Sequence, residues 1–425
     1  MSCRDAKADT TLTKEPAPVS ASERIALLDA LRGFSLLGVV LVHMVDLATL
    51  TPAFSGDIHV ELDRWAERLA RIFVVEKAQT LFALMFGISF AIQMERLESR
   101  SIDAEGLYRR RLFGLLAIGL LHAFLVPQAD ILVYYALGGF VLMSLRPLDT
   151  RALAGFGLLI ALLAMPTAAL LLGTASSSRV EPIAAVHAVV GSLASTASYQ
   201  HGSYLEVMRL TWPKIWFLDH PARGLLTFLA YVIGRFMLGV AVLRTGLLTQ
   251  ARHRRTLARA ASIGLPVGVL LTISPWILHL VDGTGWIAHP KPWHALTLYL
   301  DQAGILTLAA VYAALFALAW ESGLGRRLLS ACAPVGRMAV TNYLLQSLFV
   351  SLVFFGFGFG SLGRIGAASC ILIALAFFAA QCVLSGLWLR AFQYGPVEWL
   401  WRAWTYKRRP AWRRADACAR AEAWT

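Results

Sequence analysis

Four ionisable side chains lie in or directly after the first long apolar segment of the chain, at Asp29, Arg32, His43 and Asp46. At about 100° of turn per residue, all four fall within an arc of about 100° on one face of a helix. Charged groups inside a membrane-spanning helix are costly, so each calls for a partner or a function. Histidine takes up and returns a proton near neutral pH, and His43 is therefore predicted to act as a general base. The alternative is a buried histidine hydrogen-bonded to a neighbouring helix.

A second histidine and carboxylate flank the short turn 127–130. His122 lies near the end of one apolar segment and Asp130 opens the next, on the same predicted outer side as His43 and Asp46. These four side chains could meet there, with Asp46, His122 or Asp130 orienting the imidazole of the base, but no single segment encodes whether the helices of His43 and His122 are neighbours. A structural hydrogen bond that closes the turn is the competing interpretation.

Three further cations and one carboxylate could hold a substrate or an acyl donor. Asp29 and Arg32, three residues apart, can pair near the predicted cytoplasmic end of their helix. Arg235 stands in the middle of an apolar segment, where a permanently charged guanidinium needs an anionic ligand or an interhelix partner. Lys77 is predicted either to contact the donor or to pair with Glu76 at the membrane interface.

The segment 336–347 is dense in side chains that form hydrogen bonds. Asn342 and Gln346 are four residues apart and share a helix face, so both are candidate donor-binding residues. Polar residues of this kind also join membrane helices to one another without any substrate. The later segment 394–402 is predicted to form a turn and an interfacial anchor, with Trp399, Trp401 and Trp404 at the lipid headgroups.

These residues lie on or beside ten apolar segments, and 57% of the 425 residues are hydrophobic. About 20 apolar residues span a bilayer core. The fold class is therefore predicted to be all-α, a polytopic membrane helix bundle of about ten transmembrane helices. The expected helices are 25–45, 78–94, 111–127, 130–145, 152–173, 225–243, 260–281, 302–320, 338–358 and 366–389.

Lys and Arg alternate between the connecting segments, and the predicted inner segments hold nearly three times as many as the outer loops. This bias predicts a multi-pass protein of the bacterial cytoplasmic (inner) membrane with both termini cytoplasmic. The expected organisation is an inner tail 1–24, helices one to five over 25–173 with an outer amphipathic segment 57–75, an outer loop 174–224, helices six to ten over 225–393 and a basic inner tail 394–425. The segment 57–75 is expected to lie flat on the outer interface.

Several function classes are disfavoured by the sequence. The net charge of +13 comes from basic clusters beside apolar segments, which is typical of anchors for anionic headgroups and not of a nucleic-acid surface. The five cysteines are far apart and no His–Cys pair has ligand spacing, so neither a disulfide framework nor a metal site is predicted. No P-loop or dinucleotide-binding motif occurs, and no bound cofactor is expected.

The chain resembles the YeiB-like family of bacterial membrane proteins, known by a domain-of-unknown-function label (type 418). The resemblance covers nearly the whole chain and rests on 28–34, 41–44, 80–88, 119–122 with 130–132, 336–347 and 395–402. It implies a polytopic membrane protein and does not by itself imply a reaction.

A more distant resemblance concerns the first helix alone. Its Leu28-Asp29-x-x-Arg32-Gly33 pattern, followed by an apolar run and His43, is similar to the first helix of membrane-bound acyltransferases that act on sugars. In surface-polysaccharide O-acetylases the corresponding helix ends in a His thought to act as base, which implies that role for His43. In the related lysosomal heparan-glucosamine acetyltransferase a later His is implicated, and the nearest later one here is His59.

Two functions from different classes follow. The first is acyl transfer from an acyl-CoA such as acetyl-CoA, held by inner cations including Arg32 and the cluster 109–111, to a sugar, glycan or lipid-linked acceptor entering from the outer side. The alternative is a proton-coupled transporter or flippase that uses Arg235. A non-catalytic partner in an envelope complex is also compatible with the sequence. The oligomeric state is not predicted.

Overall fold

The structure, a computed structural model, describes residues 26–48, 61–100, 103–127, 130–171, 193–215, 221–248, 253–282 and 292–414. Over these ranges it contains helices and no strand. The α-helices are α1 Ala26–Ala48, α3 Glu61–Phe73, α4 Lys77–Ser99, α5 Ala104–Leu125, α6 Leu132–Leu145, α7 Thr150–Leu171, α9 Leu193–His201, α10 Tyr204–Ile215, α11 Pro221–Thr245, α12 Arg254–Asp282, α13 Pro292–Glu321, α14 Gly323–Leu329, α15 Ala333–Arg337, α16 Ala339–Phe354, α17 Ala367–Ala391 and α18 Pro396–Tyr406. A 3₁₀ turn, Ser330–Cys332, joins α14 to α15.

Each of the ten predicted segments coincides with a helix of this structure. Seven helices in the described part of the chain are long and apolar enough to cross a membrane, or eight if a bent pair counts as one span. They are Ala26–Ala48, Glu61–Ser99, Thr150–Ala168, Leu226–Thr245, Arg254–Leu278, Ala295–Glu321 and Ala367–Ala391. The chain is therefore an all-helical protein with the composition of a membrane protein, while ten spans, the inner-membrane location and cytoplasmic termini stay predictions.

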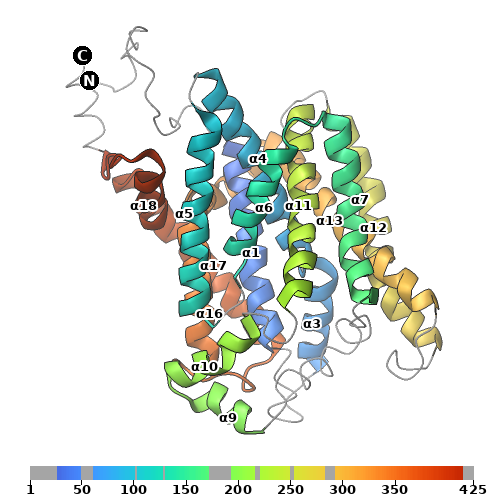
Figure 1. The fold of residues 1–425 in the computed structure, drawn as a ribbon. Helices are drawn as coiled ribbons and strands as arrows, with labels where there is room; N and C mark the ends of the chain where they lie inside the picture. The colour runs from blue at the N-terminus through green and yellow to red at the C-terminus, as the bar shows by residue number, and fades with distance from the viewer. Residues whose placement is uncertain are drawn as a thin grey trace.

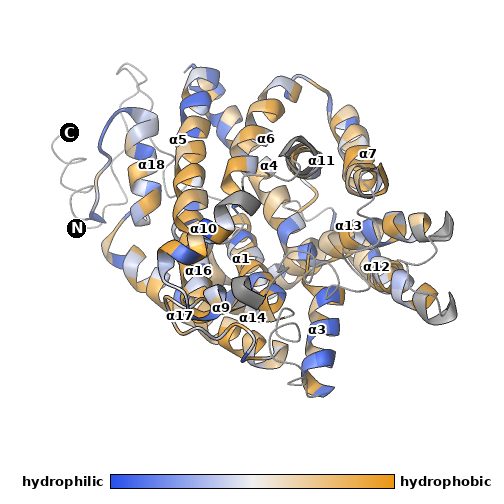
Figure 2. Cartoon of the chain, turned by 60° about the horizontal axis from the view of Figure 1, so that its bottom comes forward, coloured by the Kyte–Doolittle hydropathy of each residue, from blue (hydrophilic) through white to orange (hydrophobic). Residues whose placement is uncertain are grey.

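The helices stand side by side in one bundle (Figure 1). α11 packs against α7, α4 and α6, and α12 pairs with α13. α1 lies on the other side of the bundle from α7 and α12 (Figure 1), and it contacts α4, α15, α16 and α17. Hydrophobic residues cover most of these helices, whereas α3 carries hydrophilic and hydrophobic residues together (Figure 2). One large buried apolar cluster joins α1, α4, α5, α6, α11, α16 and α17.

Two boundaries differ from the sequence-based expectation in an informative way. α5 is 22 residues long and begins seven residues earlier than expected. The arginines of 109–111 therefore lie within its second turn and not before the helix. α3 forms over most of the predicted amphipathic segment, but it joins α4 in a helical rod, Glu61–Ser99. Three parts of the prediction fall outside the described residues. They are the tail 1–24, residues 57–60 of the amphipathic segment with His59, and much of the loop 174–224.

Two backbones cross with almost no side chain between them where α1 meets α15. An added Cβ at Gly33 would lie 2.0 Å from the carbonyl oxygen of Cys332, and one at Gly336 would lie 1.9 Å from the carbonyl oxygen of Asp29. Both positions therefore need glycine for this close approach. The crossing sets α1 directly against the α15–α16 bend.

The bend itself is sharp. The segment Gly323–Arg337, which holds α14 and α15, meets α16 at an angle of 85° beside Met338. The first N–H groups of α16 have no partner within the helix. Glu398 of α18 supplies one, since its Oε1 accepts from the N–H groups of Val340 at 2.7 Å and Thr341 at 3.0 Å. A segment near the C-terminus thus caps a helix in the middle of the bundle.

Candidate functional site

Arg32 is held in place by three bonds near the start of α1. Its Nη1 donates to Asp29 Oδ1 at 3.0 Å and to the carbonyl oxygen of Gly336 at 3.3 Å. Its Nη2 donates to Ser89 Oγ of α4 at 2.5 Å. The predicted Asp29–Arg32 pair is therefore present. The glycine crossing explains the position of Arg32, because it brings the α15 carbonyl within reach.

Arg32 lines a cavity of about 230 Å³ enclosed by α1, α4, α5, α6, the α15–α16 bend and α18. Two carboxylates line it, those of Asp29 and Glu398. Its arginines are Arg32, Arg96, Arg111, Arg337 and Arg402. Cations therefore outnumber anions five to two in this lining. Such a surface attracts an anionic ligand, and arginine is the side chain best suited to phosphate and carboxylate groups.

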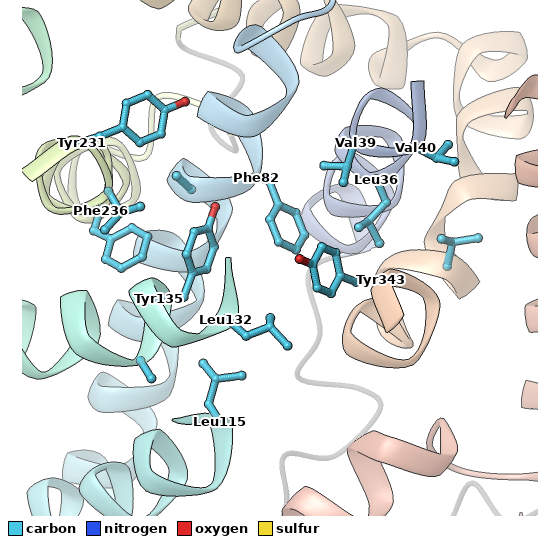
Figure 3. Packing of buried hydrophobic residues seen from close by; sticks show 14 of the residues in the cluster. Leu36, Val39, Val40, Phe82, Leu115, Leu132, Tyr135, Tyr231, Phe236 and Tyr343 are labelled. Carbon is cyan, nitrogen blue, oxygen red and sulfur yellow. The ribbon is translucent and has the colours of Figure 1, made fainter. Parts of the chain in front are cut away.

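One part of the lining of the same cavity is apolar. Phe82, Phe86, Leu115, Leu132 and Tyr135 form this part, which we call the deep end. Its aromatic rings are packed against one another, with ring centroids 5.7 Å apart for Phe82–Tyr135 and 5.2 Å for Phe86–Tyr135. Figure 3 shows the rings of Phe82 and Tyr135 beside Leu132 and Leu115. The cavity therefore matches an amphiphile with an anionic head and an apolar end.

α18 forms one wall of the cavity, which corrects the prediction that 394–402 serves as an interfacial anchor alone. Trp401 is 7% exposed, and its Nε1 donates to the carbonyl oxygen of Arg111 at 2.8 Å. The guanidinium of Arg111 lies 3.9 Å from a ring centroid of Trp401, a cation–π contact. Trp404, at 62% exposed, keeps the surface position expected of all three tryptophans.

Glu398 is buried in this wall, and burial raises the pKa of its carboxyl group. The bonds from Val340, Thr341 and the Thr341 hydroxyl work in the opposite direction. Sequence reasoning missed Glu398, Arg402 and Arg337 as site residues. The available signal was the acidic residue at the third position of α18, whose role depends on the fold that brings it to α16.

The second polar region lies further along α1, about 16 Å from Arg32 at 1.5 Å per residue. His122 Nδ1 and Asp130 Oδ1 are 2.8 Å apart and both side chains are buried. Asp130 Oδ2 also accepts from the N–H of Val133 at 2.6 Å, at the start of α6. A carboxylate oxygen can only accept, so in a bond to an ionised Asp130 the Nδ1–H of His122 is the donor.

His43 joins this pair through Tyr343 of α16. The ring centroid of Tyr343 lies 6.3 Å from that of His43 and 5.3 Å from that of His122. The Tyr343 hydroxyl accepts from the N–H of Ile131, next to Asp130, at 3.3 Å. We call His43, His122, Asp130 and Tyr343 the histidine cluster. Asp130 therefore orients His122 and not His43, and Asp46 lies exposed at the end of α1.

Four other predicted residues lie elsewhere. Arg235 is fully buried, with Nε donating to Thr80 Oγ1 at 2.9 Å and its guanidinium over the ring of Tyr231. Lys77 is buried and its Nζ donates to the carbonyl oxygen of Arg71 at 2.9 Å. Neither side chain lines the cavity.

Asn342 and Gln346 join helices. Asn342 Nδ2 donates to Ser385 Oγ at 3.0 Å, and Gln346 Nε2 donates to Gln381 Oε1 at 2.9 Å, both on α17. Gln346 also reaches the carbonyl oxygen of Leu36 on α1 at 3.2 Å. The geometry thus matches the interhelix alternative. Of the cluster 109–111, only Arg111 lines the cavity. Within the described residues, no group of three His, Cys, Asp or Glu side chains could hold a metal ion.

Comparison with known proteins gives matches along nearly the whole chain. A family model described as "Protein of unknown function (DUF418)" matches residues 242–408. The uncharacterised protein YxaH of Bacillus subtilis (strain 168) is 30% identical over 412 residues, which cover 92% of this chain and 96% of that protein. The uncharacterised protein YeiB of Escherichia coli (strain K12) is 29% identical over 408 residues, covering 91% and 97%.

No solved structure matches this chain. The full-length similarity to YxaH and YeiB agrees with the resemblance found in the motifs and extends it over the parts between them. None of these matches carries a name that states a reaction. The chain belongs to the YeiB-like DUF418 family.

Proposed function

We propose that this protein is a membrane-bound acyltransferase that uses an acyl-CoA as donor and a sugar, glycan or lipid-linked hydroxyl as acceptor. The observation that carries the proposal is one cavity with an arginine-rich mouth and an apolar deep end that approaches a histidine cluster. Leu132, at the deep end, is two residues from Asp130 of that cluster.

The arginines would bind the phosphates of the donor. Arg111 and Arg402 are held over aromatic rings, and the planar fork of a guanidinium matches the geometry of a phosphate group. At about 230 Å³ the cavity is smaller than a site for a whole drug-sized ligand. It would therefore take the pantetheine arm and acyl group, with the nucleotide part at the mouth.

His43 would be the general base. It is half-buried and so more accessible than His122, which is 4% exposed. The acceptor oxygen forms a bond to the carbonyl carbon of the thioester while its proton moves to His43. The carbon–sulfur bond then breaks, and the leaving thiolate of CoA takes up the proton that His43 received. His122, held by Asp130, lies within electrostatic range of His43 and would respond to the charge that develops there.

The test is binding of acetyl-CoA to the purified protein in detergent, followed by transfer of label from [1-¹⁴C]acetyl-CoA in membrane vesicles that contain the protein. We expect binding in the micromolar range and label in the glycolipid or glycan fraction. CoA without the acyl group and free adenosine 3′,5′-bisphosphate serve as competitors. Absence of binding to both acetyl-CoA and palmitoyl-CoA by folded protein would overturn the proposal and favour the transport alternative.

A further inference from the structure

Tyr135 is the buried phenol of the cavity whose hydroxyl has no hydrogen-bond partner among the described residues. It is 1% exposed, lies on the first turn of α6 and contributes to the deep end. Its ring is enclosed by aromatic neighbours, including Phe236 at 5.1 Å between ring centroids. A buried tyrosine usually places its hydroxyl against a partner, so this one calls for an explanation.

The two neighbouring buried phenols do not share this property. Tyr231 has its hydroxyl 3.3 Å from Thr80 Oγ1, and the Tyr343 hydroxyl accepts from the N–H of Ile131. Tyr135 lies within electrostatic range of both. Neither Tyr231 nor Tyr343 lines the cavity, whereas Tyr135 does. The one phenol of the three without a partner is therefore the one beside the cavity.

Its position also relates the cavity to the histidine cluster. Leu132 and Tyr135 are three residues apart on α6, and Ile131 directly before them binds the hydroxyl of Tyr343. Side chains on a helix lean toward its N-terminus, which carries the Tyr135 hydroxyl toward the end of α6 that bears Asp130. Figure 3 shows Tyr135, Phe82 and Tyr343 in succession between α6, α4 and α16. Tyr135 thus lines the cavity from the end of α6 that bears Asp130.

We propose that the Tyr135 hydroxyl donates a hydrogen bond to the carbonyl oxygen of the bound acyl group, and so serves as a catalytic residue. This inference rests on the acyl-CoA function proposed above. When the acceptor oxygen bonds to the carbonyl carbon, an electron pair moves onto the carbonyl oxygen and makes it an oxyanion. Tyr135 stays protonated and stabilises that charge. The pair returns as the carbon–sulfur bond breaks and the thiolate leaves.

The matched variants are Tyr135→Phe and Tyr134→Phe. Both remove one hydroxyl from adjacent positions of α6, and Tyr134 does not line the cavity. The Tyr135→Phe protein keeps the ring that packs against Phe82 and Phe86, so it should fold. Because loss of one oxyanion donor costs about 10²–10³ in kcat, we expect a fall of that size in label transfer from [1-¹⁴C]acetyl-CoA. The Kd of acetyl-CoA should change less than about threefold, since the bond strengthens mainly in the transition state.

A second readout separates this role from a structural one. Infrared spectra of bound [1-¹³C]acetyl-CoA should show the thioester carbonyl band at lower wavenumber in wild type and Tyr134→Phe than in Tyr135→Phe. Unchanged kcat and an unchanged band in Tyr135→Phe, with wild type binding and transferring normally, would overturn the role of Tyr135 alone. If wild type binds no acyl-CoA, the proposed function and this inference fall together.

Discussion

The two polar regions of the bundle differ in how their charges are balanced. The cavity has five arginines against two carboxylates, one of which already pairs with Arg32. In the histidine cluster, the carboxylate of Asp130 is matched by the His122 it contacts, and both side chains are almost fully buried. An excess of fixed cations suits the binding of an anion, whereas a matched His–Asp pair suits the handling of a proton.

This difference predicts that binding and chemistry can be lost separately. His43→Ala should lower acyl transfer by roughly 10²–10⁴, the usual contribution of general acid–base catalysis. The Kd of acetyl-CoA should stay the same, because His43 lies outside the cavity lining. The measurement is label transfer beside binding for both proteins.

His201→Ala is the control for the loss of a histidine, since His201 is exposed at the end of α9. Wild-type transfer by His43→Ala would contradict the assignment of the base. A large loss of acetyl-CoA binding in that variant would instead contradict the separation of the two regions.

The next largest effect should come from the glycine crossing that positions Arg32. Gly33→Ala would place Cβ within 2.0 Å of a backbone oxygen, so one helix must shift. We expect a loss of about 1–3 kcal/mol in the free energy of unfolding, as for other overpacked cores, together with weaker acetyl-CoA binding. Thermal unfolding in detergent and binding titrations measure both.

Gly155→Ala is the matched control, because nothing lies within 4 Å of its added Cβ. That variant should gain stability, since alanine is the better helix former by about 0.5–1 kcal/mol. Equal melting temperatures for the two variants would show that the crossing is not tight in the native protein.

A smaller effect is expected from single arginines at the cavity mouth. Arg111→Gln and Arg402→Gln should each weaken acetyl-CoA binding about tenfold, the equivalent of roughly 1.4 kcal/mol for one charge-assisted bond. Both should also reduce the dependence of Kd on salt. Arg151→Gln is the control, because this exposed arginine of α7 does not line the cavity. Equal weakening by all three would indicate a general effect of net charge.

The sequence predicted the helices well because hydrophobic runs and their boundaries are local properties. It also predicted the Asp29–Arg32 pair and the approach of His122 to Asp130, since these partners lie within eight residues of each other. Whether His43 comes near His122 could not be predicted, because no single segment encodes which helices are neighbours; in the structure the ring of Tyr343 contacts both. Their roles in a reaction remain predictions.

The cavity could not be predicted in the same way, because its wall comes from opposite ends of the chain. Glu398 reaches Thr341 and Trp401 reaches Arg111 only after α18 has packed onto the bundle. Asn342 and Arg235 were ambiguous for a related reason. A polar residue in an apolar segment must find a partner, but the segment alone does not say whether the partner is Ser385, Thr80 or a ligand.

The smallest predicted effect concerns the pH dependence of stability at Glu398, the carboxylate that links the cavity wall to α16. Burial raises the pKa of Glu398, so the folded protein keeps this proton to a higher pH than the unfolded chain does. Between the two pKa values folding takes up a proton, and the stability of wild type therefore falls as the pH rises through that window. Glu398→Gln cannot titrate and lacks this dependence. The melting temperature of wild type minus that of Glu398→Gln should thus decrease from acidic to neutral pH, even though glutamine caps Val340 and Thr341 less well.

Exposed Glu206→Gln is the control, because backbone and side-chain bonds from Ser203 lower the pKa of Glu206 and give the opposite slope. If the melting temperature of wild type minus that of Glu398→Gln increased with pH, the hydrogen bonds from the α16 N–H groups, and not burial, would set the direction of the pKa shift of Glu398.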